Sequence, residues 1–154
     1  MSSSHSFREA MSHYPTGVTV VATYYQGRAV GITANSFASV SLEPPLVLWS
    51  VAREADRAAA FLESKSYSIS FLNKEQEGIA QYCADNEDLP PGRWSENAQG
   101  FPVIDGASVV LDCRQYAVYP GGDHDIIVGE VMGISQTDGR GALSFYKSEY
   151  GKLG

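Results

Sequence analysis

The sequence predicts a mainly β protein whose strands close into an antiparallel barrel with a few short helices. Seven segments are rich in β-branched and aromatic residues and are separated by turn residues, whereas only three short segments have helical spacing. The order of these segments also lacks the regular alternation of strand and helix that builds a parallel sheet. An antiparallel barrel is therefore the favoured fold class.

The expected elements follow one another along the whole chain. An amphipathic helix is expected at 6–13, with Phe7 and Met11 on one side, and two further helices are expected at 55–62 and 75–84. The expected strands are 18–25, 28–34, 46–52, 67–72, 107–119, 125–136 and 142–146.

Glycine and proline mark the ends of several of these strands. Turns are expected at Gln26-Gly27, at Pro120-Gly121-Gly122 and at Asp138-Gly139. The strand at 46–52 is apolar at nearly every position, which predicts burial of both its faces. The segment 85–100 is polar and proline-containing, so it is expected to be an excursion at the surface.

Composition limits the classes of function. The chain has 154 residues, which predicts one domain over 1–154. Its net charge of −7 argues against nonspecific binding of nucleic acid or of anionic membranes. No segment has the layout of a signal peptide or the length of a membrane span. Cys83 and Cys113 lack metal-ligand spacing, so we expect reduced structural thiols, no metal site and a cytoplasmic location.

The segment 31–45 is the most informative part of the chain. It follows an apolar run, is crowded with small hydroxyl side chains, and ends in Pro44-Pro45, where a strand can hardly continue. Hydroxyl groups and main-chain amides at the mouth of a sheet can bind a phosphorylated ligand without a large positive charge. The chain has no Gly-x-Gly-x-x-Gly after a strand, so a bound nucleotide would not occupy a Rossmann site.

This segment resembles the flavin-contacting segment of the short-chain NAD(P)H:flavin reductases. Two other segments have the same resemblance, namely Tyr14-Pro-Thr-Gly-Val-Thr-Val-Val-Ala-Thr23 and Gly121-Gly-Asp-His-Asp-Ile-Ile-Val-Gly-Glu-Val131. The resemblance extends from about Phe7 to Leu153. It implies the Greek-key split barrel that binds FMN, a homodimer, and flavin lying across the mouth of the barrel.

The resemblance also implies which residues meet the cofactor, FMN or FAD. Asn35 can donate and accept hydrogen bonds at the polar edge of the isoalloxazine ring, and Arg57 is the expected phosphate ligand near a helix start. The expected flavin-binding residues are Thr33, Ala34, Asn35, Ser36, Ser39, Val40, Ser41, Ser50, Val51, Ala52 and Arg57. Arg53 stands where relatives often have a small or amide residue, and its role stays open.

His124 is the expected catalytic residue. It lies in a tight turn, and in the resembling family this Gly-Asp-His turn lies near the flavin and receives the nicotinamide. Because the cofactors carry out hydride transfer themselves, the expected role of His124 is positioning. Asp123 is expected to stabilise the turn. Ser148 stands where the family often has glycine, and the roles of Tyr150, Trp94 and the segment 85–100 stay open.

The expected function is reduction of FMN or FAD by NADH or NADPH, with reduced flavin passed to a partner monooxygenase. A flavin-binding protein for storage or sensing, without turnover, is the alternative. The sequence does not decide between FMN and FAD, between NADH and NADPH, or between tightly held and exchanged flavin, and it does not identify a partner oxygenase.

Overall fold

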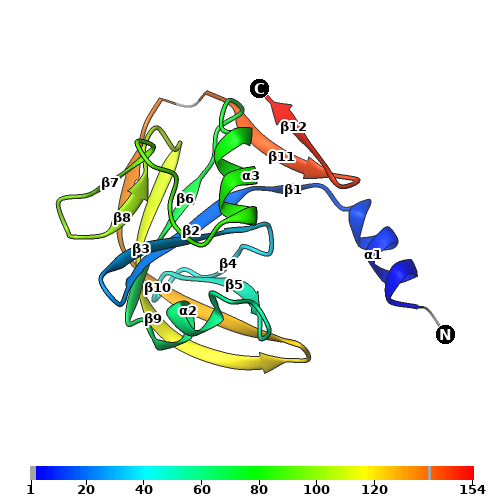
Figure 1. The fold of residues 1–154 in the computed structure, drawn as a ribbon, viewed down its shortest axis with the longest axis horizontal. Coiled ribbons are helices and arrows are strands. Elements are labelled where there is room, and N and C mark those ends of the chain that lie inside the picture. Colours follow the sequence, from blue (N-terminus) through cyan, green and yellow to red (C-terminus); the bar gives the residue numbers. More distant parts are fainter. Residues whose placement is uncertain (1–2, 139) are drawn as a thin grey trace.

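The computed structural model describes residues 3–138 and 140–154, and strands dominate these residues (Figure 1). The helices are α1 (Ser4–Ser12), α2 (Ala58–Glu63) and α3 (Glu77–Asp85). The strands are β1 (Thr16–Gly17), β2 (Thr19–Tyr25), β3 (Arg28–Ala34), β4 (Ala38–Ser41), β5 (Leu46–Ala52), β6 (Ser66–Phe71), β7 (Trp94–Glu96), β8 (Pro102–Ile104), β9 (Val109–Gly121), β10 (His124–Gln136), β11 (Ala142–Tyr146) and β12 (Glu149–Leu153). The mainly β class predicted from the sequence is confirmed.

The main sheet has seven strands in the order β3-β2-β6-β9-β10-β5-β4. Its two edge strands, β3 and β4, are consecutive in the chain. The four steps from Ala34 to Ala38 can span at most about 14 Å, so the sheet must curl until its edges approach each other. Among the described residues β3 and β4 form no ladder with each other. The strand pattern alone predicted a closed barrel, and this is wrong, because the connection brings the two edges near each other without hydrogen bonds between them in the described residues. The split form that the resemblance implied is confirmed.

Two smaller sheets flank the main one. Strands β1, β11 and β12 form an antiparallel sheet beside α1, and β7 pairs with β8 at the other side of the molecule (Figure 1). The edge of β3 is covered by the segment after α3, because Gly31 donates to the carbonyl of Glu87 and Leu89 donates to the carbonyl of Ala29. The edge of β4 is more exposed.

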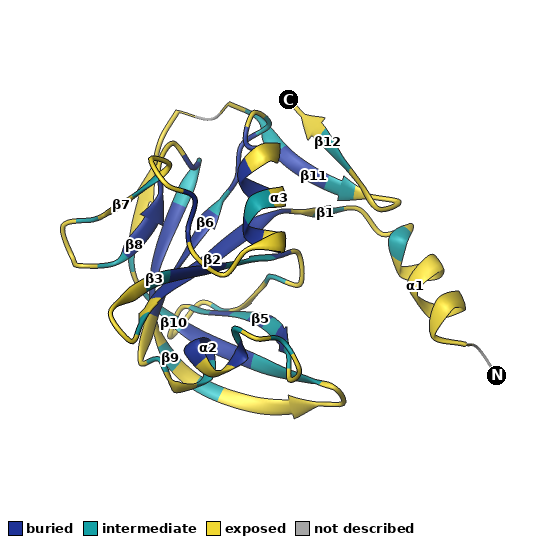
Figure 2. Ribbon diagram, in the orientation of Figure 1, coloured by how far each residue is buried: buried dark blue, intermediate teal, exposed yellow. Residues whose placement is uncertain are grey.

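Two apolar cores lie on opposite faces of β2. Val21 belongs to a core built around Trp49, which packs edge-on against Phe61 and Tyr67 with ring centroids 5.1 and 5.9 Å away. The neighbouring Val20 belongs to the second core, which reaches α3. Successive strand residues point to opposite faces, so β2 separates the two cores. Figure 2 shows this buried interior and the contrasting exposure of α1.

Local chemistry explains several boundaries. Ser3 caps α1 by accepting a hydrogen bond from the Ser6 amide at 3.1 Å. Gln26 and Gly27 have φ of 52° and 78°, the positive pair that a two-residue hairpin needs, which confirms the predicted turn. The β11–β12 turn is of the same kind, with Lys147 at φ 50° and Ser148 at φ 63°. Glycine adopts a positive φ without strain, which fits the glycine that the resemblance leads us to expect in place of Ser148.

Several boundaries differ from the prediction. The short strands β4, β7, β8 and β12 were not expected, because three to five residues at a sheet edge carry little periodicity. In β5, burial alternates along the strand, so the expectation that both faces are fully buried is wrong. Strand β9 continues through Pro120 to Gly121 because it pairs with β10 along this whole length. Gly139, in the last predicted turn, lies outside the described residues.

In residues 3–138 and 140–154, no helix is both long and apolar enough to span a membrane. Within the same part of the chain, no group of three or more His, Cys, Asp or Glu side chains is placed to hold a metal ion. Cys83 and Cys113 are free and buried.

Candidate functional site

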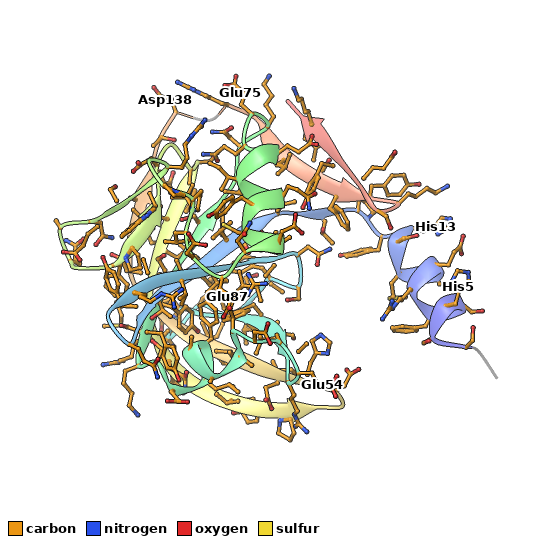
Figure 3. All side chains as sticks on the ribbon, viewed as in Figure 1. His5, His13, Glu54, Glu75, Glu87 and Asp138 are labelled. Atoms are coloured by element: carbon orange, nitrogen blue, oxygen red, sulfur yellow. The ribbon has the colours of Figure 1, made fainter. Side chains whose placement is uncertain are left out.

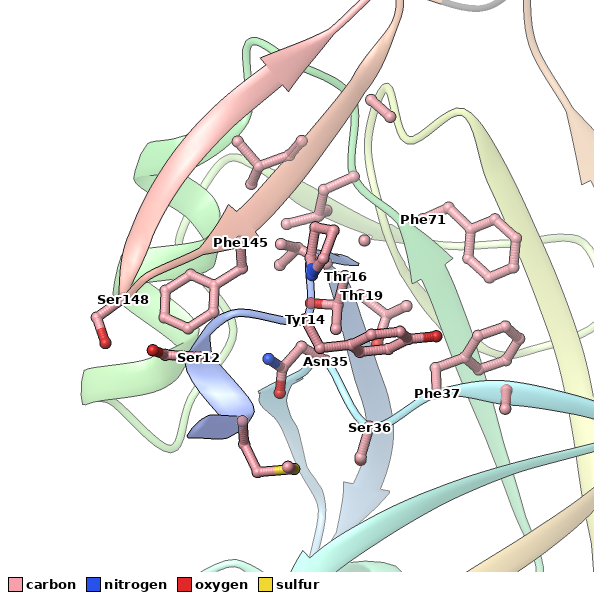
Figure 4. Close-up of a pocket in the computed structure, with 18 of the residues that line it drawn as sticks. Ser12, Tyr14, Thr16, Thr19, Asn35, Ser36, Phe37, Phe71, Phe145 and Ser148 are labelled. Atoms are coloured by element: carbon pink, nitrogen blue, oxygen red, sulfur yellow. The ribbon is translucent and has the colours of Figure 1, made fainter. Parts of the chain in front are cut away.

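A cavity of about 1010 Å³ lies between α1 and the seam where β3 passes into β4 (Figure 4). The chain between Tyr14 and Thr19 forms one wall, residues 35–38 form another, and β11 closes a third side. Pro15 sits at the bend between α1 and β1. The cavity is therefore assembled from segments far apart in the sequence.

Aromatic rings provide most of the apolar surface of this cavity. Tyr14, Phe37, Phe71 and Phe145 all line it. Phe37 packs edge-on against Phe71 with ring centroids 5.1 Å apart, which fixes both rings. Tyr14 is 74 % exposed. A flat apolar ligand can stack on such a surface.

Two polar residues predicted from the sequence, Asn35 and Ser36, lie in the cavity wall. The side-chain amide of Asn35 has no hydrogen-bond partner among the described residues, so it is available to a ligand. Ser36 Oγ accepts a hydrogen bond from the Ser50 amide at 2.9 Å. This bond attaches the β3–β4 seam to the end of β5.

The same end of β5 pairs with the start of β10. Ala52 lies opposite His124 and Val51 lies opposite Asp125 in the antiparallel register. The Arg53 amide donates to the carbonyl of Asp123 at 3.0 Å. The structure thus brings Ser36, Ser50, Val51, Ala52 and His124 into one continuous strip, although residues 50–52 and His124 do not line the cavity itself.

His124 is half-exposed at the tip of the β9–β10 hairpin. Its Nδ1 lies 2.8 Å from a carboxylate oxygen of Asp123. This hydrogen bond lowers the pKa of Asp123 and orients the imidazole ring, which leaves Nε2 free to meet a ligand. Arg53 bonds Asp125 at 3.2 Å, so its guanidinium supports the hairpin.

Arg57 has different surroundings from those expected of a phosphate ligand. Its Nη1 donates to the carbonyls of Gly31, Cys83 and Asn86 at 2.9, 2.6 and 2.9 Å, and its Nη2 lies 3.3 Å from the carbonyl of Ala84. Arg57 therefore ties α2 to β3 and to the end of α3. Three of these carbonyls lie at or beside the C-terminus of α3, where a positive charge is favourable.

The other residues predicted in 33–41 are divided between two strands. Thr33 donates its hydroxyl to the carbonyl of Ala80 at 2.6 Å, which uses that donor within the protein. Ala34 is buried at the end of β3. Ser39, Val40 and Ser41 belong to the edge strand β4, where Ser39 and Ser41 pair with β5 and Val40 lies in a bulge. These three do not line the cavity.

Sequence reasoning missed the aromatic wall and the contribution of α1. The segment Tyr14-Pro15-Thr16-Gly17 was noted for its resemblance, and that signal could have placed it in the site. Tyr150 packs against Phe145 with centroids 5.2 Å apart and lines a smaller neighbouring pocket that also contains Glu77 and Glu149. Trp94 lies on β7 and packs edge-on against Tyr24, away from the cavity.

Comparison with known proteins agrees with this architecture. Residues 11–154 match the family model described as flavin reductase like domain. The chain is 40 % identical over 151 residues to FMN reductase (NADH) SmoA of Agrobacterium fabrum, covering 97 % of this chain and 86 % of that protein. It is 35 % identical over 149 residues to the 4-hydroxyphenylacetate 3-monooxygenase reductase component of Thermus thermophilus, covering 96 % and 95 %.

A solved structure gives the same result. The NADH:FAD oxidoreductase SgcE6 of Streptomyces globisporus, in complex with NAD and FAD fragments, superimposes with a TM-score of 0.91 at 33 % identity, covering 97 % of this chain and 92 % of that one. A curled antiparallel sheet with an aromatic cavity at its seam is, by this comparison, the split barrel of a flavin-dependent oxidoreductase. The chain belongs to the flavin reductase-like family. The family, fold and enzyme class predicted from the sequence are confirmed.

Proposed function

We propose that this protein reduces FMN or FAD with NADH or NADPH and supplies the reduced flavin to a partner monooxygenase. One observation carries the proposal: the aromatic cavity at the barrel seam is joined, through the Ser36–Ser50 hydrogen bond, to the strand ends that carry His124. The cavity offers a surface for a flat ring, and the strand ends offer a polar group, His124, further along the same strip.

The residues present fit a flavin. The cavity has the size of a typical cofactor site, its rings suit the faces of an isoalloxazine, and the free amide of Asn35 suits its polar edge. Flavin, when bound, accepts a hydride from the reduced nicotinamide. The protein must then hold the two rings in register and keep bulk water from the reacting faces.

We assign the contact with the flavin ring to Asn35 and Ser36, and retain Ala34, Ser39, Val40, Ser41 and Ser50–Ala52 as flanking residues of the site. Thr33 and Arg57 have their donors engaged by main-chain carbonyls. Their part in the site is to hold β3 and α3 in position.

His124 is proposed to orient the nicotinamide. Its ring is held by Asp123 at the hairpin tip and remains half-exposed, as a positioning group must be. We expect His124→Ala to lower kcat/KM for the reduced nucleotide by roughly tenfold to a hundredfold, with flavin affinity nearly unchanged. His5→Ala is the matched control, since His5 lies on α1 far from the hairpin (Figure 3).

The direct test is oxidation of NADH and NADPH by purified protein with added FMN or FAD. Turnover with at least one pair is expected, and Asn35→Leu should weaken FMN binding by roughly tenfold. If the protein binds flavin but oxidises neither nucleotide, the result would support the alternative function in flavin storage or sensing. If bound flavin in His124→Ala is reduced at the wild-type rate at every nucleotide concentration in stopped-flow experiments, the positioning role of His124 is excluded.

A homodimer completes the proposal. Phe7, Met11 and Tyr14 on and beside α1 are exposed, as are Tyr116 and Ile134 on the long hairpin strands. The three residues on and beside α1 lie close together in the chain, and a patch of exposed apolar side chains is typical of an interface between subunits. Light scattering should report twice the chain mass; a monomer with bound flavin at micromolar concentrations would exclude the dimer.

The proposed partner is a flavin-dependent monooxygenase. Several relatives are named as reductase components of monooxygenases, including the Thermus protein described above. A cytoplasmic location is part of the proposal, supported by Cys83 and Cys113, which are both free and buried as in reducing compartments.

A further inference from the structure

The cavity has an unusual charge for this protein. The chain carries 18 acidic and 11 basic residues. Of the described residues that line the cavity, however, Arg8 of α1 is the only one with a charged side chain. A single cation in an acid-free apolar cavity creates a local positive potential that a net charge of −7 would not suggest.

Arg8 also differs from the other arginines near the site. Arg57 is engaged by carbonyls, and Arg53 is paired with Asp125. Among residues 3–138 and 140–154, no ion pair or side-chain hydrogen bond involves Arg8, which is exposed on α1. Its guanidinium is therefore available, whereas Arg57, the phosphate ligand expected from the sequence, and its neighbour Arg53 are engaged within the protein.

The position of Arg8 fits one end of an extended ligand. Asn35 and Ser36 lie in the wall formed by the seam, and Arg8 belongs to the wall formed by α1. A nucleotide that spans the cavity from the seam to α1 would bring its far end, the phosphate, beside Arg8. The guanidinium fork matches phosphate oxygens in a bidentate manner.

We propose that Arg8 binds the phosphate group of the nucleotide in this cavity. The proposal rests on the proposed function, because it takes the ligand to be FMN or the reduced nicotinamide nucleotide. Both carry the same chemistry, a phosphate ester, and the phosphate of FMN is the first assignment. Riboflavin, which has the same ring and no phosphate, separates the phosphate contact from ring binding.

The experiment compares wild type with Arg8→Gln, Arg8→Lys and the control Arg28→Gln. Arg28 is also exposed and lies outside the cavity, at the β2–β3 hairpin. Dissociation constants for FMN and riboflavin are measured by fluorescence titration, and KM for NADH is measured with riboflavin as acceptor. Arg8→Gln should weaken FMN binding by roughly tenfold to a hundredfold and leave riboflavin binding unchanged. Arg8→Lys should be intermediate, and Arg28→Gln should match wild type.

Each other outcome has a definite meaning. Unchanged FMN affinity with a raised KM for NADH in Arg8→Gln supports the proposal and assigns Arg8 to the diphosphate of the nicotinamide nucleotide. Equal losses for FMN and riboflavin, or no change for any ligand, would overturn it. If wild-type protein reduces FMN and Arg8→Gln behaves identically, only the role of Arg8 is overturned. If wild-type protein binds neither FMN nor riboflavin, the proposed function is overturned as well.

Discussion

The two sides of the barrel seam are held in very different ways. On one side, Arg57 joins α2, β3 and the end of α3 through main-chain carbonyls, and the segment after α3 covers the β3 edge. On the other side, α1 has no buried residue. The backbone contact that ties α1 to the β11–β12 turn is the hydrogen bond from the Lys147 amide to the Ser12 carbonyl, at 2.8 Å.

This difference separates stability from binding. Polar side chains on the Arg57 side form hydrogen bonds within the protein, so substitutions there should change the free energy of unfolding. Side chains on the α1 side leave their polar and aromatic groups free, so substitutions there should act on ligand affinity. The following substitutions test this division.

The largest effect is expected at Arg57. Arg57→Gln leaves several partly buried carbonyls without their donor, and each such loss costs about 1–3 kcal/mol. A decrease of about 3 kcal/mol in the free energy of unfolding is expected in urea titrations. The control, Arg28→Gln, removes an exposed arginine and should change stability by less than about 0.5 kcal/mol. Equal stability of the two variants would show that the hydrogen bonds of Arg57 do not stabilise its side of the seam.

Gly129 on β10 extends the test to the core around Trp49, which also contains Phe61 of α2. A Cβ at this position would overlap the hydroxyl oxygen of buried Tyr67 and lie 3.1 Å from its Cζ. Tyr67 is held against Trp49, so Gly129→Ala should destabilise the protein by about 1–3 kcal/mol. Gly78→Ala in α3, where a Cβ meets open space, should be neutral or stabilising. Thermal unfolding of both variants compares them directly.

Ser148 tests the α1 side. Its φ of 63° is unfavourable for a residue with a Cβ. Ser148→Gly should relieve this and raise the free energy of unfolding by up to about 1 kcal/mol. Ser148→Ala keeps the Cβ and should give no gain. A loss of stability in the glycine variant would mean that contacts of the Ser148 side chain stabilise the protein by more than the positive φ destabilises it.

The smallest effect concerns pH. Burial raises the pKa of Asp112, although Asn97 donates a hydrogen bond to its carboxylate at 2.9 Å. The folded protein therefore holds this proton more tightly than the unfolded chain does. The unfolded pKa is about 3.9. As pH rises from this value through the raised pKa of the folded state, Asp112 lowers the free energy of unfolding. Asp112→Asn should remove this part of the slope in urea unfolding measured over that range. Asp56→Asn, at an exposed position, should leave the slope intact.

The sequence predicted the long strands and the seam, because β-branched runs and turn residues are local signals. The boundaries of β3 and β5 match the prediction completely. The resemblance also named Asn35, Ser36, Ala52 and His124 as site residues, whereas the pairing of Ala52 with His124 comes from the structure alone. Residues 50–52 and His124 lie on β5 and β10, whose geometry follows from their own sequence, and Asn35 and Ser36 follow directly after β3.

The remaining parts of the site depend on contacts between distant segments. The role of Arg57 could not be predicted, because its acceptors lie 26 to 29 residues away along the chain and belong to other elements. The cavity wall at α1 was missed for the same reason. A short amphipathic helix indicates an apolar face, but periodicity does not reveal which surface that face meets.

The seam itself has one further consequence. Asn35 and Ser36 lie in the three-residue connection between β3 and β4, each of which pairs with another strand of the main sheet. The backbone amide of Ser50 donates a hydrogen bond to Ser36 and holds it in place. So short a connection has little conformational entropy left to lose. Ligand recognition at this point therefore begins from a preorganised geometry, and most of the ordering cost of binding is left to the side that carries α1.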